Sequence, residues 1–484
     1  MESKEKLPTI IQGGMGVAVS NWKLARAVSL RGQLGVISGT ALDTVLVRRL
    51  QDGDSGGHMR RAISQFPIPE AAADIIARFY KPEGRAESEP YKLLPMYRQN
   101  VTARRHMIAV IANFVEVYLA KEGHDGVVGI NLLTKVQTPN LASLYGAMLA
   151  GVDYVLMGAG IPREIPGVLD ALAVHKTATM RFDVEGFPST EPQYLTFDPT
   201  EIGADMSTPL KRPAFLPIIS ANSLATTLAR KANGSVEGFV VEGPTAGGHN
   251  APPRGAMQLN ERGEPIYGER DAVDLEKLKE LGLPFWLAGG TGSPEALADA
   301  LASGAAGIQV GTLFAFADES GFADHLKRDV LDHASRGEVD VITDPRASPT
   351  GYPFKVVSWP GDESAQHTRE RKCDLGYLRI AYKRDDGRTD YRCAAEPVED
   401  YVRKGGLEAD TVGRKCLCNA LTSNIGQPQV RAESPDEPPL LTSGDDLMSI
   451  TAFLNGRDHY SADDVIDYLF EGMTAAGVSS SYEA

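Results

Sequence analysis

The stretch LPFWLAGGTGSPEALADALASGAAGIQVGTLFA, from Leu283 to Ala315, contains the signals of a strand, a helix and a second strand in succession. The apolar runs LPFWLA and AGIQVGTLFA are typical of strands that are covered on both faces. Between them, the helical pattern SPEALADALASG has Ser293 at its N-cap, Pro294 in its first turn and Gly304 at its end. Parallel strands require a crossover of this kind, so the stretch predicts an α/β fold with a parallel sheet.

The same alternation continues through the first two-thirds of the chain. The segment SNWKLARAVSLRG predicts another helix, with Ser20 at its N-cap. Eight strands separated by helices predict a (β/α)8 TIM barrel. A doubly wound open sheet is the alternative, because strands are hard to count from one sequence. The eight apolar runs begin at Leu7, Leu34, Gly126, Val152, Phe215, Val236, Leu283 and Ala306.

Changes in composition along the chain predict its domain organisation. The barrel is expected to span residues 1–345, with a helical insertion at about 51–125 and a loop insertion at about 177–212. A cysteine-bearing extension is expected at 346–426. Residues 427–484 are expected to form an acidic, Pro-rich linker followed by a C-terminal helical segment.

The charge balance bears on the partners of the protein. Lys and Arg total 49 and Asp and Glu total 64, which gives a formal net charge of −15. An acidic chain without a long basic run is a poor ligand for nucleic acid. No apolar run approaches the length that spans a bilayer, and the N-terminal sequence MESKEKLPTIIQGGMG lacks the features of a secretion signal. We therefore expect a cytoplasmic protein that binds neither nucleic acid nor membrane; a homo-oligomer is left open.

Glycine-ended strands predict a ligand site. The loops after barrel strands converge on one face, and the glycines around Met15 let backbone approach a flat ligand closely. Gly289 and Gly290 end the seventh strand, and Gly311 and Thr312 end the eighth, where this fold usually forms a phosphate cradle. Each such end, taken alone, is also explained as a tight turn. Together they predict a mononucleotide with an aromatic head, and FMN fits that description best.

Five motifs carry a family resemblance: IIQGGMG, INLL, EGPTAGGH, the block over strands seven and eight, and ASPTGYPFKVV. This set, over roughly residues 7–360, resembles the nitronate monooxygenase family, formerly called 2-nitropropane dioxygenases, and its FMN-dependent enoyl-acyl-carrier-protein reductase relatives. The resemblance implies an FMN-bound (β/α)8 barrel. The cofactor-binding residues that it implies are Gly14, Met15, Gly16, Asn131, Gly247, Gly248, Gly289, Gly290, Gly311 and Thr312.

One histidine lies at a position suited to catalysis. His249 follows a Gly-rich break at the end of the sixth strand, where its side chain can face a bound ring. Histidine titrates near neutrality and acts as a base or as a cationic hydrogen-bond donor. The resemblance likewise implies that His249 is the active-site histidine.

The resemblance implies more than one reaction. A nitronate monooxygenase oxidises alkyl nitronates with O2 to a carbonyl compound and nitrite, with His249 taking the α-proton of a nitroalkane or holding the nitronate oxygens. The alternative is an enoyl thioester reductase that uses NAD(P)H, in which His249 protonates or polarises the enolate side. A second alternative is a non-catalytic flavin-binding protein. Thr245 before the histidine and Asn250 after it depart from the family pattern, which leaves the substrate open.

The four cysteines of the chain all lie in the extension, at Cys373, Cys393, Cys416 and Cys418. Four thiolates in one segment predict a structural zinc site or an iron-sulfur cluster. The spacing is unusual for either, because the last two form Cys-x-Cys and no second short pair accompanies them. Four buried, small apolar residues are the alternative interpretation.

Overall fold

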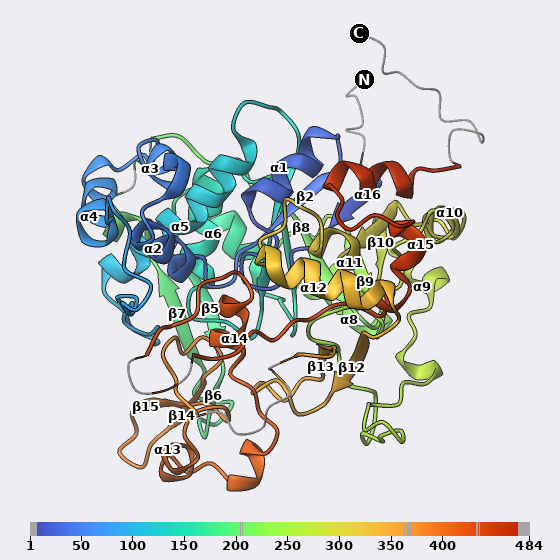
Figure 1. Cartoon of the computed structure of the whole chain (residues 1–484). Helices are drawn as coiled ribbons and strands as arrows, with labels where there is room; N and C mark the ends of the chain where they lie inside the picture. Colours follow the sequence, from blue (N-terminus) through green and yellow to red (C-terminus); the bar gives the residue numbers. More distant parts are fainter. Residues whose placement is uncertain are drawn as a thin grey trace.

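The computed structural model describes residues 7–203, 205, 207–362, 364, 370–431, 434 and 436–472. Eight parallel strands close into a barrel in which β1 pairs with both β2 and β11 (Figure 1). The prediction of a TIM barrel is therefore confirmed, and the open sheet is wrong. The strands are β1 (Ile10–Gln12), β2 (Leu34–Ser38), β3 (Val128–Leu133), β4 (Tyr154–Gly158), β8 (Ala214–Ile219), β9 (Phe239–Glu242), β10 (Phe285–Ala288) and β11 (Gly307–Val310).

Apolar side chains fill the inside of the barrel. Trp286 is fully buried there, and its indole N–H donates to the carbonyl of Pro8 over 2.8 Å. Gly307 lies where neighbouring backbone comes very close, since a Cβ atom built on it would lie 1.8 Å from the carbonyl oxygen of Thr9. The other members of this interior cluster are Ile11, Leu34, Val36, Leu156, Leu216, Val240 and Ala288.

Helices cover the outside of the barrel. Ser293 caps α10 as predicted, because its hydroxyl accepts from the backbone N–H of Ala296 over 3.1 Å. The predicted cap of α1 is displaced by one residue: Asn21, not Ser20, accepts from the first-turn N–H groups. No helix in the described ranges is long and apolar enough to cross a membrane. The covering helices include α1 (Trp22–Leu30), α2 (Leu42–Gln51), α6 (Asn140–Leu149), α7 (Ile165–Ala173), α8 (Asn222–Lys231), α9 (Leu275–Lys279), α10 (Pro294–Ala302), α11 (Thr312–Ala315) and α12 (Asp324–Ser335).

The insertion at 51–125 is helical and packs against the side of the barrel. Its long helix α5 contacts α1, α2 and α6. Gly146 lets α5 and α6 approach closely, because a Cβ atom built on it would lie 2.1 Å from the carbonyl oxygen of Val110. In Figure 1 the smaller helices of the insertion form the blue edge of the molecule. The helices are η1 (Ser55–Gly57), α3 (His58–Ile63), α4 (Pro69–Phe79) and α5 (Ala103–Lys121).

The segment at 177–212 contains short strands where the sequence predicted a loop. Strands β5 (Ala178–Phe182) and β7 (Gln193–Phe197) pair in antiparallel fashion, and η2 (Pro199–Ile202) follows them. Strand β6 (Val184–Glu185) pairs with β14 of the C-terminal extension instead. Pairing with a strand distant in sequence was not visible in the local pattern.

From here on, the extension means the whole chain from residue 340 onward, and this part of the chain contacts the barrel repeatedly. Its β12 and β13 form an antiparallel pair, and the backbone N–H of Val357 donates to Leu441. Helix α16 packs against α1. The predicted boundaries at 345 and 426 stay predictions. The elements are β12 (Asp340–Asp344), β13 (Phe354–Ser358), β14 (Ile380–Lys383), β15 (Thr389–Arg392), α13 (Val398–Arg403), η5 (Glu408–Thr411), α14 (Leu417–Ser423), η6 (Asp445–Ser449), α15 (Thr451–Leu454) and α16 (Ala462–Leu469).

A buried ionic cluster joins three parts of the chain. Arg105 of α5 donates to Asp43 of α2 over 2.6 Å, and the hydroxyl of Tyr377 in the extension donates to the same carboxylate over 2.5 Å. Arg105 also donates to the carbonyl of Pro95. Both charged side chains are at most 5 % exposed. The cluster therefore connects the helical insertion and the extension to the barrel.

Candidate active site

One cavity of about 200 Å³ lies at the carboxyl ends of the barrel strands. All eleven residues predicted to bind the cofactor or to act in catalysis line this cavity. The structure thus brings together Asn131 of β3 and residues that follow β1, β9, β10 and β11. The predicted lining residues are Gly14, Met15, Gly16, Asn131, Gly247, Gly248, His249, Gly289, Gly290, Gly311 and Thr312.

His249 is held from one side by the extension. It forms a β-bridge with Phe354, and its ring lies 4.8 Å from the Phe354 ring, centroid to centroid. Its Nε2 atom lies 2.7 Å from the hydroxyl oxygen of the buried Ser348. This contact leaves Nδ1 for a ligand. Burial lowers the pKa of His249 to about 4, so the imidazole is neutral at physiological pH.

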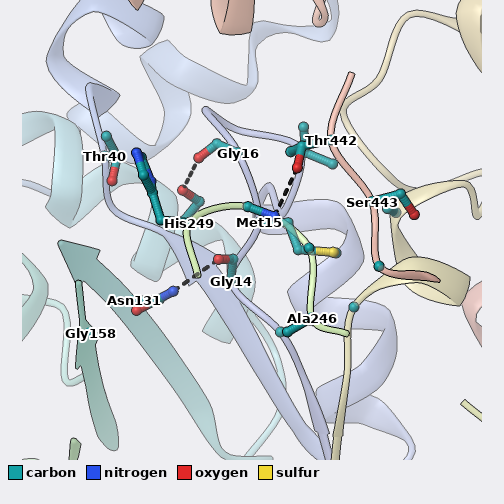
Figure 2. A pocket seen from close by; sticks show the side chains of 18 of the residues that line it. Gly14, Met15, Gly16, Thr40, Asn131, Gly158, Ala246, His249, Thr442 and Ser443 are labelled. Atoms are coloured by element: carbon teal, nitrogen blue, oxygen red, sulfur yellow. Dashed lines mark hydrogen bonds between the residues drawn. The ribbon is translucent and has the colours of Figure 1, made fainter. Parts of the chain in front are cut away.

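Two amide side chains fit the polar edge of a flat ring. Asn131 donates to the carbonyl oxygen of Gly14 over 2.9 Å (Figure 2), and its own carbonyl oxygen is buried without a partner among the described residues. Gln309, at the end of β11, also has a buried, unpartnered carbonyl oxygen. Buried acceptors of this kind need donors. The ring N–H of an isoalloxazine is a donor that suits them.

The glycines of the site differ in what surrounds their Cα atoms. Gly14 is needed for packing, because a Cβ atom built on it would lie 2.4 Å from the Cβ atom of Asn131. Gly247 faces the extension, because a Cβ atom built on it would lie 2.7 Å from the backbone carbonyl carbon of Ser443. Gly248 has φ +78° and only open space beyond its Cα atom. Gly248 is therefore the glycine whose backbone most freely admits a ligand.

The predicted phosphate cradle, in the loops after β10 and β11, also lines the cavity. Gly289 and Gly290 have φ values of +89° and +71°, which turn the chain after β10. The hydroxyl of Thr312, at the start of α11, accepts from the backbone N–H of Gly444 over 3.1 Å. The carboxyl group of Asp446 accepts from the backbone N–H of Gly292 over 3.3 Å. A carboxyl group therefore lies beside the loop expected to hold a phosphate.

Sequence reasoning missed the part of the cavity that the extension supplies. Thr442 accepts from the backbone N–H of Gly248 over 2.8 Å, a bond drawn in Figure 2. The backbone N–H of Asp445 donates to the carbonyl of Thr245 over 3.0 Å. The acidic, Pro-rich sequence around this segment resembles a solvated linker and gave no signal of a site. Extension residues in the cavity wall are Tyr377, Leu378, Leu417, Cys418, Leu421, Asn424, Thr442, Ser443, Gly444 and Asp446.

Glu242 is a second titratable group in the cavity wall, and it was not among the predicted site residues. It is the last residue of β9, and among the described residues no group donates a hydrogen bond to its carboxyl group. Burial raises its pKa to about 8, so it is mostly protonated at neutral pH. Its place at the carboxyl end of a barrel strand was the available signal.

The cysteines lie together but not as a metal site. Cys393 and Cys416 are buried around Ala395, and Cys418 packs against this cluster. Burial raises the pKa of Cys373, Cys393 and Cys418. In the described part of the chain, no three His, Cys, Asp or Glu side chains are placed to share a metal ion. The prediction of zinc or an iron-sulfur cluster therefore has no support in the structure.

An open groove of about 450 Å³ adjoins the cavity, and Tyr377 and Leu378 line both. The groove runs between the segment at 178–193 and the extension. Lys135 and Arg181 line it and form no ion pair with any described residue. Its acidic lining residues are Asp183, Glu185 and Glu191.

The comparisons with known proteins agree with these motifs. Residues 203–344 match the nitronate monooxygenase family. This part of the chain runs from β8 to β12 and contains Glu242, His249 and both loops of the predicted phosphate cradle. The predicted resemblance to nitronate monooxygenases is confirmed for this segment. The comparison with curated proteins finds no match.

Several solved structures are similar to the chain over nearly its whole length. FabK from Thermotoga maritima is 16 % identical, with 97 % of this chain and 94 % of that chain covered and a TM-score of 0.46. Nitroalkane oxidase from Streptomyces ansochromogenes is 15 % identical, with coverages of 97 % and 98 % and a TM-score of 0.47. The enoyl reductase domain of MlnA from Bacillus amyloliquefaciens is 11 % identical, with coverages of 96 % and 94 % and a TM-score of 0.47. Likeness at this level bears on neither reaction nor substrate.

Proposed function

We propose that the chain is an FMN-dependent nitronate monooxygenase that oxidises alkyl nitronates with O2 to a carbonyl compound and nitrite. The observation that carries this proposal is the single cavity in which His249 lies together with the glycine-ended loops after β1, β10 and β11. The family match over residues 203–344 supports a flavin oxidoreductase. FMN, when bound, would supply the electron-transfer chemistry between the substrate and O2.

The chain's own residues would hold the cofactor at its two ends. Asn131 and Gln309 would accept hydrogen bonds from the polar edge of the ring, because their buried carbonyl oxygens lack partners among the described residues. Gly248 would admit the ring or the phosphate through its backbone. The loops after β1, β10 and β11 would complete the site, through Gly14, Met15, Gly16, Gly289, Gly290, Gly311 and Thr312.

His249 and Glu242 would handle the substrate. A neutral imidazole can take the α-proton of a nitroalkane, and Ser348 fixes its orientation through the 2.7 Å contact. A protonated Glu242 can donate a hydrogen bond to a nitronate oxygen. Both residues are only partly exposed to solvent, and such interactions are stronger there than in bulk water.

A second candidate function is the reduction of an enoyl thioester with NAD(P)H. The observation that favours it is the groove beside the cavity, where Lys135 and Arg181 are exposed cations without an ion-pair partner among the described residues. A groove of this kind suits a long substrate or a dinucleotide that carries phosphate groups. The alkyl nitronate of the first candidate is small and would not need it.

An anaerobic flavin absorbance titration separates these candidates. An alkyl nitronate is added to one sample of the purified protein, and NADH or NADPH to another. Loss of flavin absorbance with the nitronate alone supports the monooxygenase. Loss with a nucleotide alone supports enoyl reduction, and a flavin that responds to neither is expected of a non-catalytic binding protein. A protein that binds no flavin would overturn all three.

Replacement of Glu242 tests its role through the pH profile. Because burial raises the pKa of Glu242 to about 8, kcat/KM is expected to fall as pH rises through about 8 and the hydrogen-bond donor is lost. The Glu242→Gln variant keeps a donor that does not titrate, so its profile should lack this limb. The exposed Glu261→Gln variant serves as the control and should keep the limb. An unchanged alkaline limb in Glu242→Gln would assign that titration to another group.

A further inference from the structure

We propose that the carboxyl group of Asp446 and the phosphate of FMN share one proton, so that binding of FMN weakens relative to binding of riboflavin as pH rises. The inference rests on the proposed function, since it assumes that the cavity holds FMN with its phosphate at the loops after β10 and β11. Through Asp446, the extension would regulate how tightly the cofactor is retained.

The carboxyl group of Asp446 lies beside the loop after β10. One of its oxygens accepts from the backbone N–H of Gly292 over 3.3 Å. A Cβ atom built on Gly292 would lie 2.9 Å from that oxygen, and one built on Gly290 would lie 3.8 Å from the other oxygen. The carboxyl group also lines the cavity. It therefore lies against the loop that is expected to cradle the phosphate, where two negative charges would repel each other.

The segment around Asp446 is anchored, so the carboxyl group cannot simply move away. The backbone N–H of Gly444 donates to Thr312, and that of Asp445 donates to Thr245. Lys355 of β13 forms an ion pair with Asp445 over 2.5 Å. On the other side, Leu447 is completely buried. Four anchors within four residues favour protonation over displacement as the way to relieve the repulsion.

The electrostatic surroundings also favour a proton. The turn η6, which begins at Asp445, packs against β12, α11, α12 and α15. The negative charge of the neighbouring residue Asp445 acts on the Asp446 carboxyl group. The nearby cation Lys355 is already paired with Asp445. Burial, with the charge of Asp445, raises the pKa of Asp446. Arg262, farther away, interacts with Asp340, Glu264 and Asp445 rather than with Asp446.

Flavin binding measured at several pH values tests the proposal without any turnover assay. The apoprotein is titrated with FMN and with riboflavin between pH 6 and 9, and the quenching of flavin fluorescence gives each Kd. Titration of Glu242 in the same cavity would act on both flavins alike, so the ratio of the FMN Kd to the riboflavin Kd reports on Asp446. For the wild-type protein, this ratio is expected to rise by up to tenfold per pH unit, the limit for one shared proton. In Asp446→Asn, FMN should bind more tightly than in the wild type at pH 8, and the ratio should not depend on pH above pH 7.

The controls distinguish failure of this inference from failure of the proposed function. Asp445→Asn removes a neighbouring charge but keeps the Asp446 carboxyl group, so it should retain the pH dependence. Asp446→Ser replaces Asp446→Asn if the latter unfolds, as judged by thermal melting. A ratio of FMN Kd to riboflavin Kd that does not depend on pH in the wild type, or depends on it equally in Asp446→Asn, would overturn the inference alone. Binding of neither flavin would reject the proposed function and the inference with it.

Discussion

The His249→Ala variant is expected to keep its bound flavin and to lose turnover by a factor of about 10²–10⁴, the usual contribution of a general acid or base. The physical reason is that His249 lines the cavity with a neutral imidazole held by Ser348 and Phe354, whereas other residues would hold the cofactor. The measurement is kcat/KM with a neutral nitroalkane, which still carries the α-proton that His249 would take, together with the flavin absorbance of the purified variant.

The pH profile sharpens this prediction. Burial lowers the pKa of His249 to about 4, so on the acidic side the wild-type protein should show no limb near 6.5 and should lose activity only as pH falls toward 4. The exposed His459→Ala variant is the matched control and should behave as wild type. Wild-type turnover in His249→Ala would remove this residue from the mechanism.

The Arg105→Ala variant is expected to lose about 3–5 kcal/mol of unfolding free energy, as is typical when one partner of a buried ion pair is removed. The variant would leave the carboxylate of Asp43 buried, with the backbone N–H of Thr44 and the hydroxyl of Tyr377 as donors but without a cation. The measurement is equilibrium unfolding in urea, followed by circular dichroism.

The neighbouring arginine provides a control for Arg105. Arg104 is 60 % exposed and pairs with Asp74 on the surface at 3.4 Å. Surface pairs contribute about 0–1 kcal/mol, so Arg104→Ala should unfold nearly as wild type. Similar losses in the two variants would mean that the buried cluster does not stabilise the fold as its geometry indicates.

The barrel could be predicted from sequence because each strand is a local pattern. The eight apolar runs correspond to the eight barrel strands, and the sequence from Leu283 to Ala315 forms β10, α10 and β11 as expected. The short strands β5, β6 and β7 could not be predicted, because their pairing depends on partners elsewhere in the chain. Strand β6, with two residues, is defined by its pairing with β14.

The residues of the candidate site likewise fall into those with a local sequence signal and those without one. Glycines and a histidine at strand ends gave a local signal, and the barrel topology brings them into one cavity. Tyr377 and Asp446 gave none, since they reach the cavity only through contacts across long stretches of sequence, such as the bond that the Gly292 N–H donates to Asp446. The clustered cysteines gave a misleading signal, because proximity in sequence does not supply the geometry of a metal site.

The contacts of Thr442 and Gly444 with the cavity loops have a consequence for biosynthesis. A chain emerging from the ribosome has exposed all eight barrel strands once Val310 has left the exit tunnel, yet the wall of the cavity still lacks the segment near residue 444. The nascent barrel would therefore present an open, glycine-rich mouth while more than one hundred further residues are made. Cofactor capture is thus expected to be a late, post-translational event, and a chain cut at residue 345 would keep the strands but not the closed site.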